Sequence, residues 1–168
     1  MIKLETPLTE EVIKKLKIGD KVLLSGYIYC GRDAVLPKLV EKIAGNAIEE
    51  SSINLRGSVI FHTAVSPAGV GPTSSNKLEI ENSIIPLSKA GVKIHLGKGA
   101  IKTETTQGLK ENNSVFAVIP PVTALLEAKT REKRVVAFAE EGMEAFWQLK
   151  VTDYPIIIAS ANGASIYD

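Results

Sequence analysis

Two basic side chains stand directly after apolar, strand-like segments, and this position suggests that they bind an anion. Arg32 follows the run 21–30, which is rich in Val, Leu, Ile and Tyr. Lys98 lies between two glycines, just after the run 92–96. In α/β sheets ligands collect outside the carboxyl ends of the strands, and an arginine there can bind a carboxylate with two parallel hydrogen bonds. The pattern predicts a carboxylate site. An Arg32–Asp33 ion pair and a solvated turn lysine are the plainer alternatives.

A third candidate is the segment 66–76, which reads SPAGVGPTSSN. Its density of Gly, Pro and Ser predicts a loop. The hydroxyls of Thr73 and Ser74, beside backbone amides, could bind an anion there. Neither a phosphate-binding GxxxxGK[ST] motif nor a GxGxxG fingerprint is present, and Pro72 lacks a backbone donor. Taken alone, the segment is more typical of a structural turn than of a site.

The histidines and the cysteine predict little chemistry of their own. His62 and His95 fall in apolar segments and are expected in the core or at a sheet edge, and no Ser/His/Asp arrangement is apparent. Cys30, the only cysteine, is predicted to be buried and unreactive. One thiol cannot hold an iron–sulfur cluster or a structural zinc, because each needs several ligands. No metal ligand is therefore predicted in this chain.

The composition limits the classes of protein to which this chain can belong. The chain has 168 residues with 20 Lys+Arg and 19 Asp+Glu, a net charge of +1, and 45% of its residues are hydrophobic. This length and composition favour one globular domain over residues 1–168. The charge balance gives no support to nucleic-acid binding, and no apolar run is long enough to span a membrane. The first residues, MIKLETPLTEEVIKKL, do not resemble a signal peptide, so we expect a cytoplasmic protein.

The hydrophobic pattern alternates strands with helices and then becomes strand-rich. A short helix is expected after Thr9 as its N-cap. A second helix is expected from Asp33 as its N-cap, with Pro37 in its first turn. Further strands are predicted at 57–63, 92–96, 114–119, 134–139, 146–152 and 155–160, and further helices up to 89 with an interruption near Pro86, at 102–110 and at 122–129. Asn162-Gly163 predicts a hairpin turn. The order predicts an α/β fold with a mixed sheet.

Five short segments occur in an order that resembles a known family. They are Arg32-Asp33-Ala34, Gly71-Pro72-Thr73-Ser74, Gly97-Lys98-Gly99, Gly142-Met143-Glu144-Ala145-Phe146-Trp147 and Val151-Thr152-Asp153-Tyr154-Pro155. The set resembles the beta subunit, or C-terminal domain, of class I fumarases and L-tartrate dehydratases, and the likeness covers nearly the whole chain. The last two segments are the most specific part, and the shorter ones add weight through their order and spacing.

The resemblance implies a swivelling β/β/α domain in which a mixed sheet is flanked by helices. It also implies a hydro-lyase that interconverts a hydroxy-dicarboxylate and its dehydrated product. Malate and fumarate are the first choice, and L-tartrate or a related hydroxy acid is the alternative. In that family an alpha subunit or N-terminal domain holds a [4Fe–4S] cluster through three cysteines, which agrees with the single cysteine here. The expected partners are an alpha subunit and a small dicarboxylate, with a homodimer left open.

The resemblance also implies roles for residues at matching positions. Thr73 would remove the carbon-bound proton. Substrate-binding residues would be Arg32, Lys98, Ser74 and Lys77. A threonine hydroxyl is a poor base in water, so this role requires activation by the cationic site.

Three departures from the family pattern leave the substrate open. Leu36 stands where the family usually has a histidine, Lys77-Leu78 replaces Arg-Met, and Pro120-Pro121 replaces a Gly-Gly pair. Lysine keeps the charge of arginine but loses its planar fork. These changes are also compatible with a function of another class, that of a non-catalytic substrate-binding or regulatory swivelling module.

Overall fold

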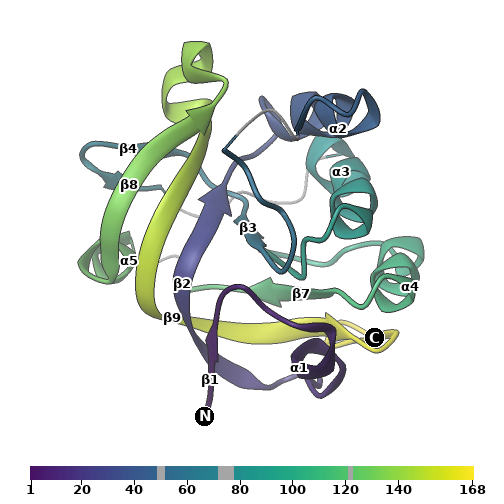
Figure 1. Cartoon of the computed structure of the whole chain (residues 1–168). Coiled ribbons are helices and arrows are strands. Elements are labelled where there is room, and N and C mark those ends of the chain that lie inside the picture. The colour runs from purple at the N-terminus through teal and green to yellow at the C-terminus, as the bar shows by residue number, and fades with distance from the viewer. Residues whose placement is uncertain (49–51, 72–77, 121–122) are drawn as a thin grey trace.

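A mixed sheet of eight strands forms the centre of the molecule (Figure 1). The computed structural model describes residues 1–48, 52–71, 78–120 and 123–168. The strands of the sheet are β1 (Ile2–Glu5), β2 (Lys21–Cys30), β3 (Val59–Phe61), β6 (Ile94–Gly97), β7 (Val115–Val118), β8 (Thr130–Ala137), β9 (Phe146–Ala161) and β10 (Ala164–Ser165). A separate antiparallel pair is made by β4 (Val65–Ser66) and β5 (Gly69–Val70).

Four adjacent strands run in the same direction, in the order β2, β3, β6, β7. Their register aligns Cys30 with Phe61 and Phe61 with Leu96. The carboxyl ends of these strands therefore meet at one edge of the sheet, which we call the carboxyl edge. The opposite side, where the strands begin, is called the amino edge.

The long strand β9 closes the sheet on itself. One of its sides pairs with β2 over most of its length, from Trp147 opposite Cys30 to Ile157 opposite Lys21. Its other side pairs first with β8 and then with β7. Figure 1 shows β9 and β2 curving together through the centre of the molecule. The closure joins the sequence-distant ends of the chain, because β9 lies next to both β2 and β7.

Helices cover the outside of this sheet. In Figure 1, α2, α3 and α4 follow one another along one side, and α5 lies on the other side near β4 and β8. The helices are α1 (Glu10–Lys14), α2 (Leu36–Ala44), α3 (Leu78–Lys89), α4 (Thr103–Glu111), α5 (Thr123–Ala128) and the 3-10 helix η2 (Ala139–Glu144). No helix within the described ranges is long and apolar enough to cross a bilayer.

Alternating side chains of the parallel strands fill two hydrophobic layers. Val59 and Phe61 of β3 belong to the layer inside the closed sheet. Ile60, between them, packs with Leu39 of α2 and Ile80 of α3 in the layer under the helices. Successive side chains of a strand point to opposite faces, so strands covered on both sides read as continuous apolar runs. The packing explains why the short central strands carry almost no polar residues.

Much of the predicted local structure is confirmed. The class is α/β with a mixed sheet and flanking helices. Strand β2 has the predicted bounds, and Thr9 caps α1 by accepting a hydrogen bond from the Val12 amide at 3.3 Å. Asn162 and Gly163 both have positive φ, and they connect the antiparallel strands β9 and β10.

Other predictions were wrong. Asp33 does not cap α2, because Val35 occupies the N-cap and the carboxylate of Asp33 lies 3.7 Å from the Arg32 guanidinium instead. Pro86 does not interrupt α3, because the helix continues through it while burying one face against the sheet. That packing outweighs the hydrogen bond a proline removes. The segments 146–152 and 155–160 form the single strand β9, and β1 was not predicted at all.

Candidate functional site

The carboxyl edge brings together segments that the sequence separates widely. Arg32 follows β2, His62 and Thr63 follow β3, and Lys98 follows β6. Strand ends of this kind leave backbone groups and side chains pointing away from the packed sheet, which is why ligands bind there. The prediction that Arg32 and Lys98 lie after strand ends is confirmed.

Arg32 and Lys98 both lie just beyond the ends of strands at this edge. Each lies two residues beyond a member of the aligned set Cys30, Phe61 and Leu96. One strand, β3, separates β2 from β6, so the ends of these two strands are about 10 Å apart at the usual strand spacing. Arg32 is half-buried and Lys98 is exposed. Long side chains at this separation can approach the two ends of one small dianion.

Arg32 lies in ion-pair distance of Glu144, from the end of η2. Its Nε lies 2.6 Å from Glu144 Oε1 and 3.7 Å from Asp33 Oδ1. The plainer alternative, an ion pair of Arg32 with Asp33, is therefore present, and Glu144 lies closer to Nε than Asp33 does. Sequence reasoning missed this role of Glu144. The signal that could have found it is the Gly142–Trp147 segment, which carried the resemblance without being placed in the site.

Gly71, the first residue of the Gly-Pro-Thr segment, is fixed to the carboxyl edge. Its amide donates to the Ala64 carbonyl at 2.8 Å, and its carbonyl accepts from Thr63 Oγ1 at 2.7 Å. A Cβ at this position would lie 3.0 Å from the Ala64 carbonyl oxygen, which favours glycine here. The next residues, including the candidates Thr73, Ser74 and Lys77, lie outside the described residues.

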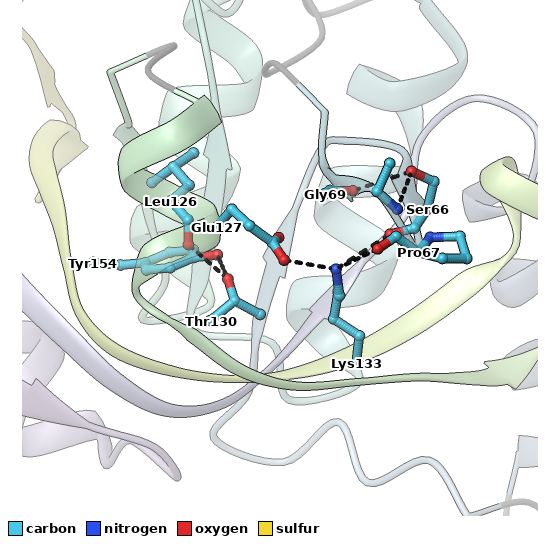
Figure 2. Close-up of polar contacts among 9 residues, drawn as sticks. Ser66, Pro67, Gly69, Leu126, Glu127, Thr130, Lys133 and Tyr154 are labelled. Carbon is cyan, nitrogen blue, oxygen red and sulfur yellow. Dashed lines mark hydrogen bonds and ion pairs between the residues drawn. The ribbon is translucent and has the colours of Figure 1, made fainter.

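The β4–β5 hairpin that leads to Gly71 is attached to β8 and α5, as Figure 2 shows. Lys133 of β8 donates to the carbonyls of Ser66 and Pro67 at 3.3 and 3.4 Å. The same ammonium contacts Glu127 Oε1 at 2.9 Å. An open hollow of about 640 Å³ lies between this hairpin and α5, and Gly71 and Met143 are among the residues that line it. The attachment holds the hairpin in place beside the carboxyl edge.

The two histidines are buried next to each other beneath the carboxyl edge. The ring centroids of His62 and His95 are 6.3 Å apart, and neither residue is exposed. His95 Nε2 shares a hydrogen bond of 2.8 Å with Ser88 Oγ on α3. Burial lowers the pKa of His95, and the charge that His62 would carry lowers it further. The expectation that both histidines belong to the core is confirmed.

The described part of the chain does not fit a metal or cluster site. It contains no group of three or more His, Cys, Asp or Glu side chains that could hold a metal ion. Cys30 is fully buried on β2, and burial raises the pKa of its thiol far above the usual range. A buried thiol of this kind stays protonated, whereas cluster and metal ligands are thiolates. The predicted burial of Cys30 is confirmed.

Comparison with known proteins relates this chain to one family. The Fumarase C-terminus family model matches residues 1–168. A protein of Methanocaldococcus jannaschii named "Putative L(+)-tartrate dehydratase subunit beta" is 33% identical over 96% of this chain and 88% of its own length. The "L(+)-tartrate dehydratase subunit beta" of Escherichia coli K12 is 28% identical over 95% of this chain and 82% of its own length.

A third relative is longer. A protein of Geobacillus stearothermophilus named "Putative fumarate hydratase class I" is 30% identical over 100% of this chain. The chain spans only 34% of the length of that relative. The two beta-subunit relatives are therefore similar to this chain in length as well as in sequence.

Proposed function

The chain belongs to the Fumarase C-terminus family, and from this premise we propose that it is the beta subunit of a heteromeric hydro-lyase. The enzyme would interconvert a hydroxy-dicarboxylate and its dehydrated product. Malate and fumarate are the first choice of substrate pair. The observation that supports the proposal is that Arg32 and Lys98 follow the carboxyl ends of β2 and β6, two strands that β3 separates.

A dianionic substrate explains why two separated cations are useful. Each carboxylate needs a positive or amide partner once it leaves water. Removal of a proton next to a carboxylate builds further negative charge, and fixed cations stabilise that charge in the transition state. In the proposal Arg32 binds one carboxylate through its planar fork and Lys98 binds the other as a point charge.

The Gly-Pro-Thr segment supplies the remaining groups of the proposal. Thr73 accepts the carbon-bound proton, and Ser74 and Lys77 bind substrate oxygens. The support for these roles is the family pattern in the sequence, together with the attachment of Gly71 to the end of β3. Neighbouring cations would lower the pKa of the threonine hydroxyl and so make it a better proton acceptor.

The proposed partner is an alpha subunit that carries the [4Fe–4S] cluster. This division follows from the fit of the chain itself, because its one cysteine is buried in the core and no other ligand group is found among the described residues. The proposal assigns this chain the carboxylate-binding part of the site and assigns the cluster to the other chain.

Tartrate dehydration is the second candidate, and one observation favours it. The relatives named as tartrate dehydratase beta subunits match this chain over 88% and 82% of their lengths, whereas the relative named as a fumarate hydratase matches over 34%. Separate beta subunits of similar length fit a two-chain enzyme of either specificity.

The test is a substrate panel. The chain is co-expressed anaerobically with the alpha-type chain of its own organism, and the purified complex is assayed with malate, fumarate and both tartrate enantiomers. Turnover of one of these supports the proposal and names the substrate. A complex that forms, contains its cluster and turns over none of the four contradicts it. That result would favour the non-catalytic binding module.

A further inference from the structure

The ammonium group of Lys133 joins three parts of the molecule, as Figure 2 shows. Lys133 lies on β8, directly opposite the buried Leu149 of β9. Its side chain therefore points to the inside of the closed sheet, and only 18% of it is exposed. The ammonium donates to Glu127 Oε1 at 2.9 Å and to the carbonyls of Ser66 and Pro67 at 3.3 and 3.4 Å. A lysine has three donors, so one side chain can bind all three acceptors at once.

The core holds the carboxylate partner of Lys133 in place. Leu126, the residue before Glu127, is fully buried in the layer inside the closed sheet. Its carbonyl accepts a hydrogen bond of 2.7 Å from Thr130 Oγ1, which shares a second hydrogen bond with the hydroxyl of the buried Tyr154. These contacts fix the end of α5 against β8 and β9. Glu127 therefore offers Lys133 an acceptor whose backbone is anchored in the core.

The β4–β5 hairpin is too short to be stable by itself. Each of its strands has two residues, and even a longer isolated hairpin is at best marginally stable in water. Val65 and Val70 pair with each other and are buried in the inner layer, so they fix the base of the hairpin. Lys133 binds the other end, at the carbonyls of Ser66 and Pro67. One ammonium group thus attaches the turn of the hairpin to β8 and α5.

The same hairpin leads into the Gly-Pro-Thr segment. Gly71 directly follows β5, and Thr73, the proposed proton acceptor, comes two residues later in the sequence. From this connection we infer that Lys133 is a positioning residue for the Gly-Pro-Thr segment, an inference that rests on the proposed function. By holding the turn of the hairpin, Lys133 sets the position of the chain at Gly71. A shift of a reacting group by about 1 Å can cost about 100-fold in rate, so this distant contact affects turnover.

The test separates positioning from a purely structural role. Complexes with the alpha-type chain are prepared for the wild type, Lys133→Met, Lys133→Arg and the matched control Lys150→Met. Methionine has a similar length but no donor. Lys150 lies on the neighbouring strand β9, where its ammonium is 3.8 Å from Glu132 Oε2 and its side chain is 48% exposed. KM and kcat are measured with the substrate that the wild-type complex turns over, and thermal unfolding is followed for each variant.

We expect Lys133→Met to lower kcat about 10- to 100-fold, while KM changes less because Arg32 and Lys98 are retained. Lys133→Arg should recover part of the loss, because a guanidinium can donate to the same acceptors. The control should match the wild type. A purely structural role would lower the unfolding temperature of Lys133→Met but leave kcat unchanged well below that temperature, and this result would overturn the inference.

A direct readout keeps this inference separate from the proposed function. The amide of Gly71 donates to the Ala64 carbonyl at 2.8 Å, and the amide of Ile158, on β9, donates to the Asp20 carbonyl at 2.9 Å. In the full chain, Lys133→Met should accelerate hydrogen exchange at Gly71 at least about tenfold and leave exchange at Ile158 unchanged.

The exchange experiment gives an answer whatever the activity. If the wild-type complex is inactive, the proposed function fails, and exchange at Gly71 still decides whether Lys133 holds the hairpin. Glu127→Ala removes only the carboxylate partner and should accelerate exchange at Gly71 to a smaller extent, which provides a second variant if Lys133→Met does not fold. Unchanged exchange at Gly71, or equal acceleration at Gly71 and Ile158, overturns the inference.

Discussion

Basic side chains lie at both edges of the parallel strands, but their surroundings differ. At the amino edge, Arg56, Lys89 and Lys93 line a polar cavity of about 580 Å³. The buried Lys93 donates there to the Asn112 carbonyl at 3.4 Å and to Glu10 at 3.5 Å. At the carboxyl edge the Nε of the half-buried Arg32 lies 2.6 Å from Glu144 Oε1, and Lys98 is exposed.

Buried hydroxyls at the amino edge bond to the backbone. At the amino edge Ser58 donates to the Leu55 carbonyl at 2.6 Å, and Ser114 donates to the Val92 carbonyl at 2.7 Å. These side chains satisfy backbone acceptors where strands begin, which a buried polar group requires. The amino edge therefore serves stability, while the carboxyl edge is the place to look for substrate binding.

The most demanding test of the difference between the edges removes one arginine from each of them. In the two-chain complex, Arg32→Ala should lower kcat/KM at least about 100-fold, because a desolvated carboxylate loses its charged partner. Arg56→Ala, at the amino edge, should change kcat/KM less than twofold. Steady-state kinetics measures both, and a comparable loss in the two variants would contradict the assignment of the edges.

A second matched pair of variants removes one lysine from each edge. Lys98→Ala should lower kcat/KM about 10- to 100-fold, a smaller effect than that of Arg32→Ala because an exposed ammonium is more strongly screened by water. Lys89→Ala, at the exposed end of α3, should leave kcat/KM close to that of the wild type. Higher salt should raise KM in the wild type and have less effect in Lys98→Ala. If Lys98→Ala retains full activity at low salt, Lys98 is not a substrate contact.

The buried histidines predict how stability depends on pH. The pKa of His95 is lowered in the folded chain, so below the ordinary value of about 6.5 the unfolded chain binds a proton that the folded chain does not. Stability should therefore be constant above this pH and fall below it, by up to about 1.4 kcal/mol per pH unit.

Urea unfolding at pH 7.5 and at pH 5.0 measures this effect. His95→Gln removes the titrating group, so it should lose less stability between the two pH values than the wild type. An equal loss in both proteins would show that groups other than His95 account for the acid sensitivity.

The smallest expected effect tests the role of the amino edge. Ser114→Ala removes the hydroxyl that donates to the Val92 carbonyl and should lower the free energy of unfolding by about 1 kcal/mol. The activity of the folded complex should not change. Urea unfolding and steady-state kinetics on the same preparation check both statements, and a loss of kcat/KM without a loss of stability would mean that this edge also contributes to the site.

Local patterns predicted the parts of the structure that depend on nearby residues. The strand 21–30, the Thr9 cap and the Asn162-Gly163 turn follow from side-chain type, capping and backbone preference. The place of Arg32 and Lys98 after strand ends followed from the same patterns. These features depend on interactions within a few positions along the chain.

The features that the local sequence patterns did not predict depend on contacts between residues far apart in the chain. Strand β1 is short and its pattern is weak, and it forms because β2 offers a parallel partner. Strand β9 continues through Asp153, at φ 53°, and Pro155 because β2 pairs with it on both sides of them. Glu144 meets Arg32 only because β8 and β9 bring η2 back to the end of β2. No window of sequence contains both partners of these contacts.

The most direct measurement of the central account is an omission assay. Each chain is purified anaerobically, alone and as the complex, and the initial rate with the preferred substrate is measured. We expect turnover only when both chains are present, and we expect turnover to be lost when this chain carries Arg32→Ala although the complex still forms. Full turnover by the alpha-type chain alone, or by a complex that carries Arg32→Ala, would contradict the claim that this chain binds the substrate carboxylates.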